Sequence, residues 1–418
     1  MVYFARGGFY LSIAKALNIV IGLGLVVAFA NLLEPEKYGN YKYIITLVSI
    51  AGVFTLTGIN SAVSRSVAKG FDGILRDGVY TAMQWSIGAT IILLCASTYY
   101  FFNDNVGLSA GLLIGALTAP LIAGWSLYNN FLAGAQQYIY QGGFSVIRNL
   151  SLALLLFVVL FFSHEPAILA IFYFLGTALI LWLLYSLTLK IFRPSRRTDP
   201  DVLSHAKHLS LIVVLSTLAA QLDKVLVFSQ IGATALAIYS FALIGPQQFR
   251  DMNSIVASVA FPKMSRRTFK ELQHVIPSKS FPLFIVAIVV CAIYILFIPL
   301  LFKLFFPLYI DAVPYSQVLI LSILFVFPAT LYNQAFITHK KNKELYILNT
   351  VVPLLRLGLM VGLMPFYGIW GLVGATVFSY AVGFLLLLYL FFKADETTDV
   401  QKVGDNGNLD LPEKELAP

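Results

Sequence analysis

Long apolar stretches recur along the whole chain, and they restrict its fold more than any other feature. Stretches of roughly 20 apolar residues alternate with short polar loops about twelve times. A bilayer core is about 30 Å thick and needs ~20 helical residues to cross it. Because lipid offers no hydrogen-bond partners, each span must satisfy its own backbone as a helix. The sequence therefore predicts an all-α integral membrane protein with about 12 transmembrane helices.

The order of spans and loops predicts two lobes of six helices each. The spans are expected at residues 9–33, 40–62, 79–102, 106–133, 144–163, 166–189, 208–231, 234–260, 281–305, 314–337, 345–364 and 367–392. The longest internal polar loop lies between the sixth and seventh spans. The expected units are an N-terminal lobe (1–192), a cytoplasmic linker (193–207), a C-terminal lobe (208–393) and a disordered acidic tail (394–418).

Basic residues cluster on one side of the predicted topology. Of the 28 lysines and arginines, 21 fall in alternate loops and at the termini, and 3 fall in the intervening loops, at Lys37, Lys42 and Lys303. The positive-inside rule then places both termini in the cytoplasm. The net charge of +8 therefore reflects membrane topology, and we expect no nucleic-acid partner.

The polar loops contain no pattern typical of an enzyme. The five histidines lie in or near loops without metal-ligand spacing, and the two cysteines lie inside apolar stretches. We therefore expect no catalytic residues, no metal site and no cofactor. A membrane glycosyltransferase or polymerase would need a large loop with catalytic acids, and the external loops are too short for one.

Charged residues inside the predicted spans are the strongest functional signal. A charge at mid-bilayer costs a few kcal/mol, so it generally faces a cavity or a partner. Gln247, Arg250, Asp251 and Ser254 follow helical spacing and form one polar face of their helix. Similar polar stripes include Lys15 with Asn18 on the first helix and Thr217, Gln221 and Lys224 on the seventh; Arg356 lies near the middle of the eleventh.

These positions predict a basic cavity between the lobes. Depths along the helices place Lys15, Arg250 and Arg356 from the middle of the membrane to its cytoplasmic half. A cavity of this kind suits an anionic substrate, and arginine suits phosphate because its planar fork makes bidentate contacts. The alternatives are that Arg250 only joins neighbouring helices through polar contacts and that Lys15 extends to the interface.

Two acidic residues inside the spans, Asp223 and Asp251, are candidates for coupling transport to H+ or Na+. A carboxylate buried without a nearby cation is disfavoured in its charged form and can take up a proton. The alternative for Asp223 is a fixed ion pair with a basic residue on another helix.

Several segments resemble one known family. LLEPEKYGNYKY at 32–43 and LDKVLVFSQIGATALAIYSFA at 222–242 are similar to segments of the polysaccharide-transporter family of Wzx-like O-antigen flippases. The same resemblance extends to FPKMSRR at 261–267, FPLY at 306–309 and PFYGIWGLVGATVFSY at 365–380, and it covers nearly the whole chain. This family belongs to the multidrug/oligosaccharidyl-lipid/polysaccharide exporter superfamily.

The resemblance implies a flippase of the cytoplasmic membrane that works by alternating access. Its implied substrate is an undecaprenyl-diphosphate-linked oligosaccharide, and its implied partners are membrane lipids and a polysaccharide polymerase machinery. Lys15 and Arg250 match cations that contact the diphosphate in related flippases, and Arg356 is a further match. The alternative is a cation-coupled multidrug or metabolite exporter of the same superfamily, for which an acid-rich cavity is expected.

Overall fold

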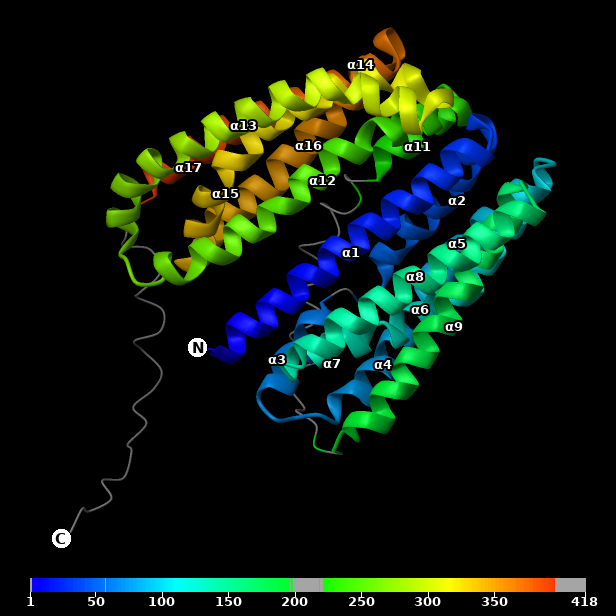
Figure 1. Cartoon of the computed structure of the whole chain (residues 1–418), viewed down its shortest axis with the longest axis horizontal. Coiled ribbons are helices and arrows are strands. Elements are labelled where there is room, and N and C mark those ends of the chain that lie inside the picture. Colours follow the sequence, from blue (N-terminus) through cyan, green and yellow to red (C-terminus); the bar gives the residue numbers. More distant parts are fainter. Residues whose placement is uncertain (1, 57, 196, 198–217, 219–220, 395–418) are drawn as a thin grey trace.

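Helices make up the regular structure throughout the described part of the chain. The computed structural model describes residues 2–56, 58–195, 197, 218 and 221–394, and shows no strand among them (Figure 1). The elements are α1 (Val2–Leu32), α2 (Pro35–Ala51), η1 (Gly52–Phe54), α3 (Ile59–Ala68), α4 (Ile74–Trp85), α5 (Ile87–Phe102), α6 (Val106–Trp125), α7 (Leu127–Gly134), α8 (Tyr138–Phe162), α9 (Pro166–Phe192), α11 (Leu222–Gln230), α12 (Ala233–Met264), α13 (Phe269–Phe305), η2 (Pro307–Ala312), α14 (Val313–Leu319), η3 (Ile320–Ser322), α15 (Ile323–Thr338), α16 (Asn342–Tyr367) and α17 (Ile369–Lys393).

Most of these helices are long and apolar enough to cross a membrane. The described residues contain nine such segments, and ten if the pair Pro35–Phe54 and Ile59–Ala68, bent by 60°, is one broken span. The chain is therefore a multi-pass membrane protein. Half of the predicted seventh span (208–231) and most of the linker and acidic tail lie outside the described residues. The count of about twelve spans accordingly stays a prediction.

Several helices begin earlier than their apolar stretches suggested. The helix α2 begins at Pro35, a residue suited to the first position of a helix, and not at residue 40. The helix α13 begins at Phe269, not at 281, because Thr268 caps it: the Glu271 backbone N–H donates to Thr268 Oγ1 over 3.3 Å, and the Thr268 N–H donates back to the Glu271 carboxylate. A prediction that starts each helix at its first apolar residue misses such polar first turns.

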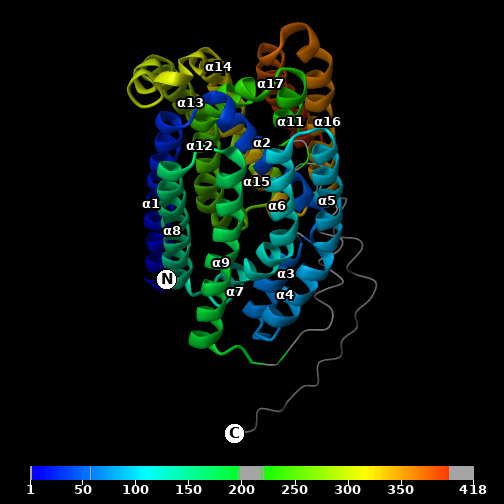
Figure 2. The same cartoon turned by 90° about the vertical axis from the view of Figure 1, so that its right-hand side faces the viewer.

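The helices pack as two groups. Helices α1 to α9, here called the N-terminal group, pack mainly against one another, and α11 to α17, the C-terminal group, do the same (Figure 1). The groups meet where α2 contacts α11 and α12, and where α1 contacts η2 and α13. Figure 2 shows α14 near the top of the view and α3, α4 and α7 towards the bottom.

The buried clusters differ between the two ends of the molecule. The largest cluster mixes both groups, with Tyr38 and Tyr41 of α2 against Phe241 of α12 and Tyr309 of η2; this end is called the joined end. A second cluster contains residues of the N-terminal group, including those of α3 and α7. A third contains residues of the C-terminal group, around α12, α13, α15 and α17. The end that carries these two separate clusters is called the split end.

The joined end is packed closely enough to require a glycine. A Cβ atom on Gly39 of α2 would overlap the backbone carbonyl of Ala233 at the start of α12. Beside this contact the ring of Tyr43 stacks on Phe228 of α11, with centroids 3.6 Å apart. Two hydrogen bonds also cross between the groups: Asn31 Nδ2 donates to the Phe305 carbonyl over 3.0 Å, and Tyr309 OH donates to the Leu33 carbonyl over 3.4 Å.

Candidate functional site

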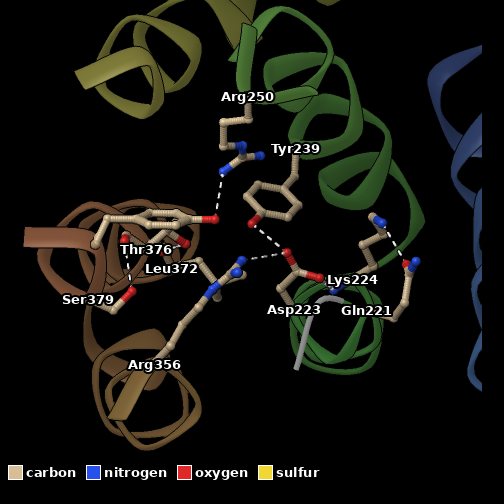
Figure 3. A network of polar contacts seen from close by, with 10 residues as sticks. Gln221, Asp223, Lys224, Tyr239, Arg250, Arg356, Leu372, Thr376 and Ser379 are labelled. Carbon is tan, nitrogen blue, oxygen red and sulfur yellow. Dashed lines mark hydrogen bonds and ion pairs between the residues drawn. The ribbon is translucent and has the colours of Figure 1, made fainter. Parts of the chain in front are cut away.

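A buried carboxylate, Asp223, lies at the centre of a polar network in the C-terminal group. It is in the first turn of α11 and its side chain is 2% exposed. One of its oxygens, Oδ2, accepts from Tyr239 OH over 2.9 Å and pairs with Arg356 Nη2 over 3.3 Å (Figure 3). The other oxygen accepts from the backbone N–H of Lys224 over 2.8 Å. The fixed ion pair was one of the two alternatives for Asp223, and the structure contains it.

Arg356 reaches this carboxylate from another helix, α16. Its side chain is 15% exposed, so both partners of the ion pair are largely buried. The Nε atom of Arg356 is buried and has no hydrogen-bond partner in the described part of the chain. The Nε–H donor of the guanidinium therefore stays unused while Nη2 holds Asp223. A buried pair of this kind carries a large penalty when one partner alone is removed.

Arg250 lies one helix away, on α12. Its Nη1 donates to Tyr380 OH of α17 over 3.4 Å, and its guanidinium carbon lies 5.6 Å from the centre of the same ring. Figure 3 shows Arg250 and Arg356 on the same side of Tyr239 and Asp223. The sequence-predicted cations Arg250 and Arg356 are thus brought into one region of the C-terminal group.

Lys15 connects the two groups. Its Nζ, on α1, donates to the backbone carbonyl of Asp251 on α12 over 3.3 Å. Asp251 itself is exposed. Asn18, one turn further along α1, faces its own group instead: Nδ2 donates to Ser145 Oγ of α8 over 3.0 Å. The expected stripe on α1 therefore divides, with Lys15 directed to the C-terminal group and Asn18 directed to α8.

A cavity of about 260 Å³ lies between the groups, on the joined-end side of these contacts. Residues of α1 and α2 line it from one side, and Lys224 with Ser240 and Gln247 line it from the other. Lys224 Nζ donates to Gln221 Oε1 over 2.7 Å, as their spacing of three residues predicts. Figure 3 shows this pair on the side of α11 away from Arg356.

Lys42 is a functional candidate that the sequence analysis counted with the external loops, although it falls inside the expected span 40–62. In the structure Lys42 belongs to α2, which begins at Pro35, and it lines the cavity. Its Nζ lies 5.8 Å from the centre of the Tyr38 ring. The proline at the first helical position was the sequence signal that could have started this helix at residue 35. Tyr239 was also missed, since a tyrosine among apolar residues reads as core.

The arrangement favours binding of an anion over binding of a metal ion. Basic side chains converge from four helices, α1, α2, α11 and α12, with Arg356 of α16 behind them. Among the described residues, no group of three histidine, cysteine or acidic side chains could hold a metal ion. The residues Thr217 and the side chain of Ser254, which extended two of the predicted polar faces, lie outside what the structure describes.

Solved structures of transporters share this fold. An inward-facing multidrug resistance MATE family transporter of the MOP superfamily matches with a TM-score of 0.69 at 13% identity, covering 90% of this chain and 94% of that one. The lipid II flippase MurJ, in an inward closed conformation, matches with a TM-score of 0.68 at 18% identity, covering 92% and 87%. An outward-facing MATE transporter gives 0.60 at 14% identity, covering 94% and 95%.

A search of curated proteins finds no match. The family model described as "Polysaccharide biosynthesis protein" matches residues 4–268, which is more than half of the chain. That range begins in α1 and continues through α12, so it includes Lys15, Lys42, Asp223, Lys224 and Arg250. The chain therefore belongs to the polysaccharide biosynthesis protein family.

Proposed function

We propose that this protein is a flippase that moves an undecaprenyl-diphosphate-linked oligosaccharide from the inner to the outer leaflet of the cytoplasmic membrane. The observation that carries the proposal is a set of basic side chains: Lys15, Lys42 and Lys224 lie between the two groups of helices, and Arg250 lies beside them in the C-terminal group. A diphosphate offers several charged oxygens, which ammonium and guanidinium groups bind through charge-assisted hydrogen bonds. Membership of the polysaccharide biosynthesis family supports a glycan as the remainder of the substrate.

The proposed mechanism is alternating access between two six-helix lobes, which correspond to the N-terminal and C-terminal groups. The shared cluster closes the joined end, and the separate clusters leave the lobes independent at the split end. In this conformation the substrate enters from the split end. The higher TM-score with the inward-facing MATE transporter than with the outward-facing one supports this assignment.

We propose that the split end faces the cytoplasm. Arg65 of α3, Lys69 directly after α3 and Arg266 two residues after α12 belong to this end, whereas Lys37 pairs with Glu165 across 3.6 Å at the joined end. In a cysteine-free background, an impermeant thiol reagent outside intact cells should label Ser163→Cys and not Ser195→Cys. Labelling of Ser195→Cys alone would reverse the orientation.

Coupling to H+ or Na+ through Asp223 or Asp251 stays a prediction. Because Asp223 already binds Arg356, it would have to release that guanidinium before it could bind an ion.

A polysaccharide polymerase remains the proposed downstream partner. A cation-coupled drug exporter of the same superfamily is the competing function, and the basic cavity counts against it because a cationic drug would meet lysines first.

The test is translocation in proteoliposomes that contain a fluorescent undecaprenyl-diphosphate oligosaccharide in one leaflet. Wild-type protein should expose the probe in the opposite leaflet. Arg250→Ala should lower the rate at least tenfold, which is about 1.4 kcal/mol of lost interaction, and Arg250→Lys should restore part of it. The matched control is Arg266→Ala, an exposed arginine in the turn that follows the same helix. Transport of a cationic dye without transport of the lipid would contradict the proposal.

A further inference from the structure

Another cavity, of about 430 Å³, lies at the split end and belongs to the C-terminal group alone. Apolar side chains of α12, α13 and α15 form its walls, and two cations, Arg267 and Lys279, complete its lining. Leu272, Ile276 and Lys279 follow helical spacing and so share one face of α13. Arg267 and Lys279 are exposed, and neither forms an ion pair with another described residue. The cavity, here called the α13 groove, is therefore apolar with a basic rim.

The α13 groove lies beyond the part of α13 that crosses the hydrocarbon core. The helix has 37 residues and is ~55 Å long, whereas the core is about 30 Å thick. Its apolar stretch, 281–305, is long enough to cross the core by itself, and the first turns contain the exposed residues Lys270, Glu271 and His274. The groove residues of α13 belong to this polar extension, 269–280. A water-soluble segment of protein can therefore reach the groove more readily than the acyl chain of a lipid.

The end of α17 is fixed beside this groove. Gln273 of α13 donates through Nε2 to the carbonyl of Phe391 over 2.7 Å and to that of Ala394 over 3.1 Å. Ala394 is buried and shares the third cluster with Leu272 of the groove wall. The acidic tail therefore starts at the helix that forms one wall of the groove.

The sequence of the acidic tail complements the groove. Residues 395–418 contain seven acids and two lysines. Among them Leu409 and Leu411 flank Asp410, and a proline and Glu413 follow. The residue before a proline favours extended backbone, in which Leu409 and Leu411 share one side and Asp410 takes the other. The leucines suit the apolar walls, and the acids suit the basic rim.

The connection is long enough for this segment to reach the groove. Leu409 follows Ala394 by 15 residues, and a flexible chain of that length covers ~20 Å on average and ~50 Å when extended. Along α13, Lys279 lies ~9 Å from Gln273, which holds the end of α17. A tether of this length keeps the segment at a millimolar effective concentration, so that weak contacts are sufficient.

We infer that the α13 groove is the docking site of the chain's own acidic tail. Leu409 and Leu411 lie against the apolar walls, and the acids beside them meet the basic rim. Docking neutralises part of the positive charge at the split end, and it links the end of α17 to the turn between α12 and α13. The contact needs no substrate, so it goes beyond the proposed function and does not depend on it.

The experiment measures one distance between spin labels in the full-length protein, in a background without Cys95 and Cys291. The labels are at Ser278→Cys, an exposed position next to the groove, and at Asn408→Cys in the tail. The protein is held in nanodiscs of neutral phosphatidylcholine without substrate. We expect a narrow population of short distances, which represents the docked tail.

Two double variants should reduce the docked population. Leu409→Ser with Leu411→Ser keeps every charge and should lower the ratio of docked to free tail about tenfold or more, because the burial of two leucines is lost. Arg267→Gln with Lys279→Gln should lower the ratio about threefold, since contacts between exposed charges are weaker.

The matched controls should leave the docked population unchanged. Val400→Ser with Val403→Ser removes apolar side chains from another part of the tail. Lys340→Gln with Lys343→Gln removes two exposed lysines from the turn between α15 and α16.

Four outcomes would overturn the inference. Wild type could show only a broad distribution of long distances. The serine variant at the two leucines could keep the short distances, which would mean that charge alone attracts the tail. The lysine control could reduce the docked population as much as the rim variant does. Loss of the short distances in nanodiscs of anionic phosphatidylglycerol would assign the groove to a lipid headgroup instead.

Discussion

The two ends of this molecule are built differently, although both are formed from apolar helices. At the joined end α2, α12 and η2 share one aromatic cluster, and a glycine is needed where α2 meets the start of α12. At the split end each group of helices has its own buried cluster. Under the proposed alternating access, each group would keep its own core intact when the joined end opens. Motion would then concentrate in the shared cluster, and the charged residues between the groups would meet alternating surroundings.

The joined end depends most on Gly39. Its replacement by alanine should keep the end from closing, because the added Cβ atom would overlap the backbone carbonyl of Ala233. We expect glycan export in a deletion strain to fall at least tenfold. A thiol introduced by Ala237→Cys, at a fully buried position of the shared cluster, should become reactive in the Gly39→Ala background.

The control for this prediction is Gly24→Ala, since a Cβ at Gly24 meets nothing within 4 Å. It should export normally and leave Ala237→Cys protected. Normal export by Gly39→Ala, together with an unreactive thiol at 237, would show that close packing at this point is not required.

The ion pair between Asp223 and Arg356 belongs to the C-terminal group alone, so it should affect stability more than gating. Arg356→Gln leaves a buried carboxylate without its cation and should cost about 3–5 kcal/mol. The double variant Asp223→Asn with Arg356→Gln should recover part of that loss. Thermal unfolding of Arg356→Gln, Asp223→Asn and the double variant in detergent measures both effects. A double variant less stable than either single variant would contradict the pairing.

A smaller effect is expected from one hydrogen bond across the joined end. Tyr309→Phe removes the bond from the tyrosine hydroxyl to the Leu33 carbonyl, which is worth about 1 kcal/mol, and should raise the reactivity of Ala237→Cys several-fold. Tyr332→Phe is the matched control, because that hydroxyl bonds Ser280 within the C-terminal group. If both variants change the reactivity equally, the hydrogen bond does not contribute specifically to closure.

The sequence predicted the membrane character and the charged residues better than it predicted their partners. Apolar length alone identifies helices, and helical spacing alone placed Gln221 with Lys224. The ion pair of Asp223 with Arg356 joins residues 133 apart, and only the tertiary packing decides which of several cations reaches the carboxylate. Helical spacing alone could therefore not decide whether Asp223 is a coupling site or part of a fixed ion pair.

Helix ends account for most of the remaining differences. Lys42 was counted with a loop, although it falls inside the expected span 40–62, because the first turns of α2 are polar. The break between Pro35–Phe54 and Ile59–Ala68 also follows from no apolar pattern, and it shifts α3 by 60° relative to α2. Asn18 shares its helical face with Lys15 in sequence, yet it meets Ser145 because α8 packs along that side. Such outcomes depend on neighbouring helices rather than on local sequence.

The central claim is that the two ends open in alternation around an anionic lipid-linked glycan. It is tested most directly by two distances between spin labels in a background without Cys95 and Cys291. One pair, Glu36→Cys with Thr234→Cys, crosses the joined end, and the other, Lys69→Cys with Arg266→Cys, crosses the split end. All four positions are exposed.

Without substrate, the joined-end pair should be close and the split-end pair far apart. During turnover with the lipid-linked oligosaccharide, a second population should appear in which the joined-end distance is longer and the split-end distance is shorter. The account predicts that both changes occur together in the same population. Translocation of the substrate while both distances keep their original values would contradict it.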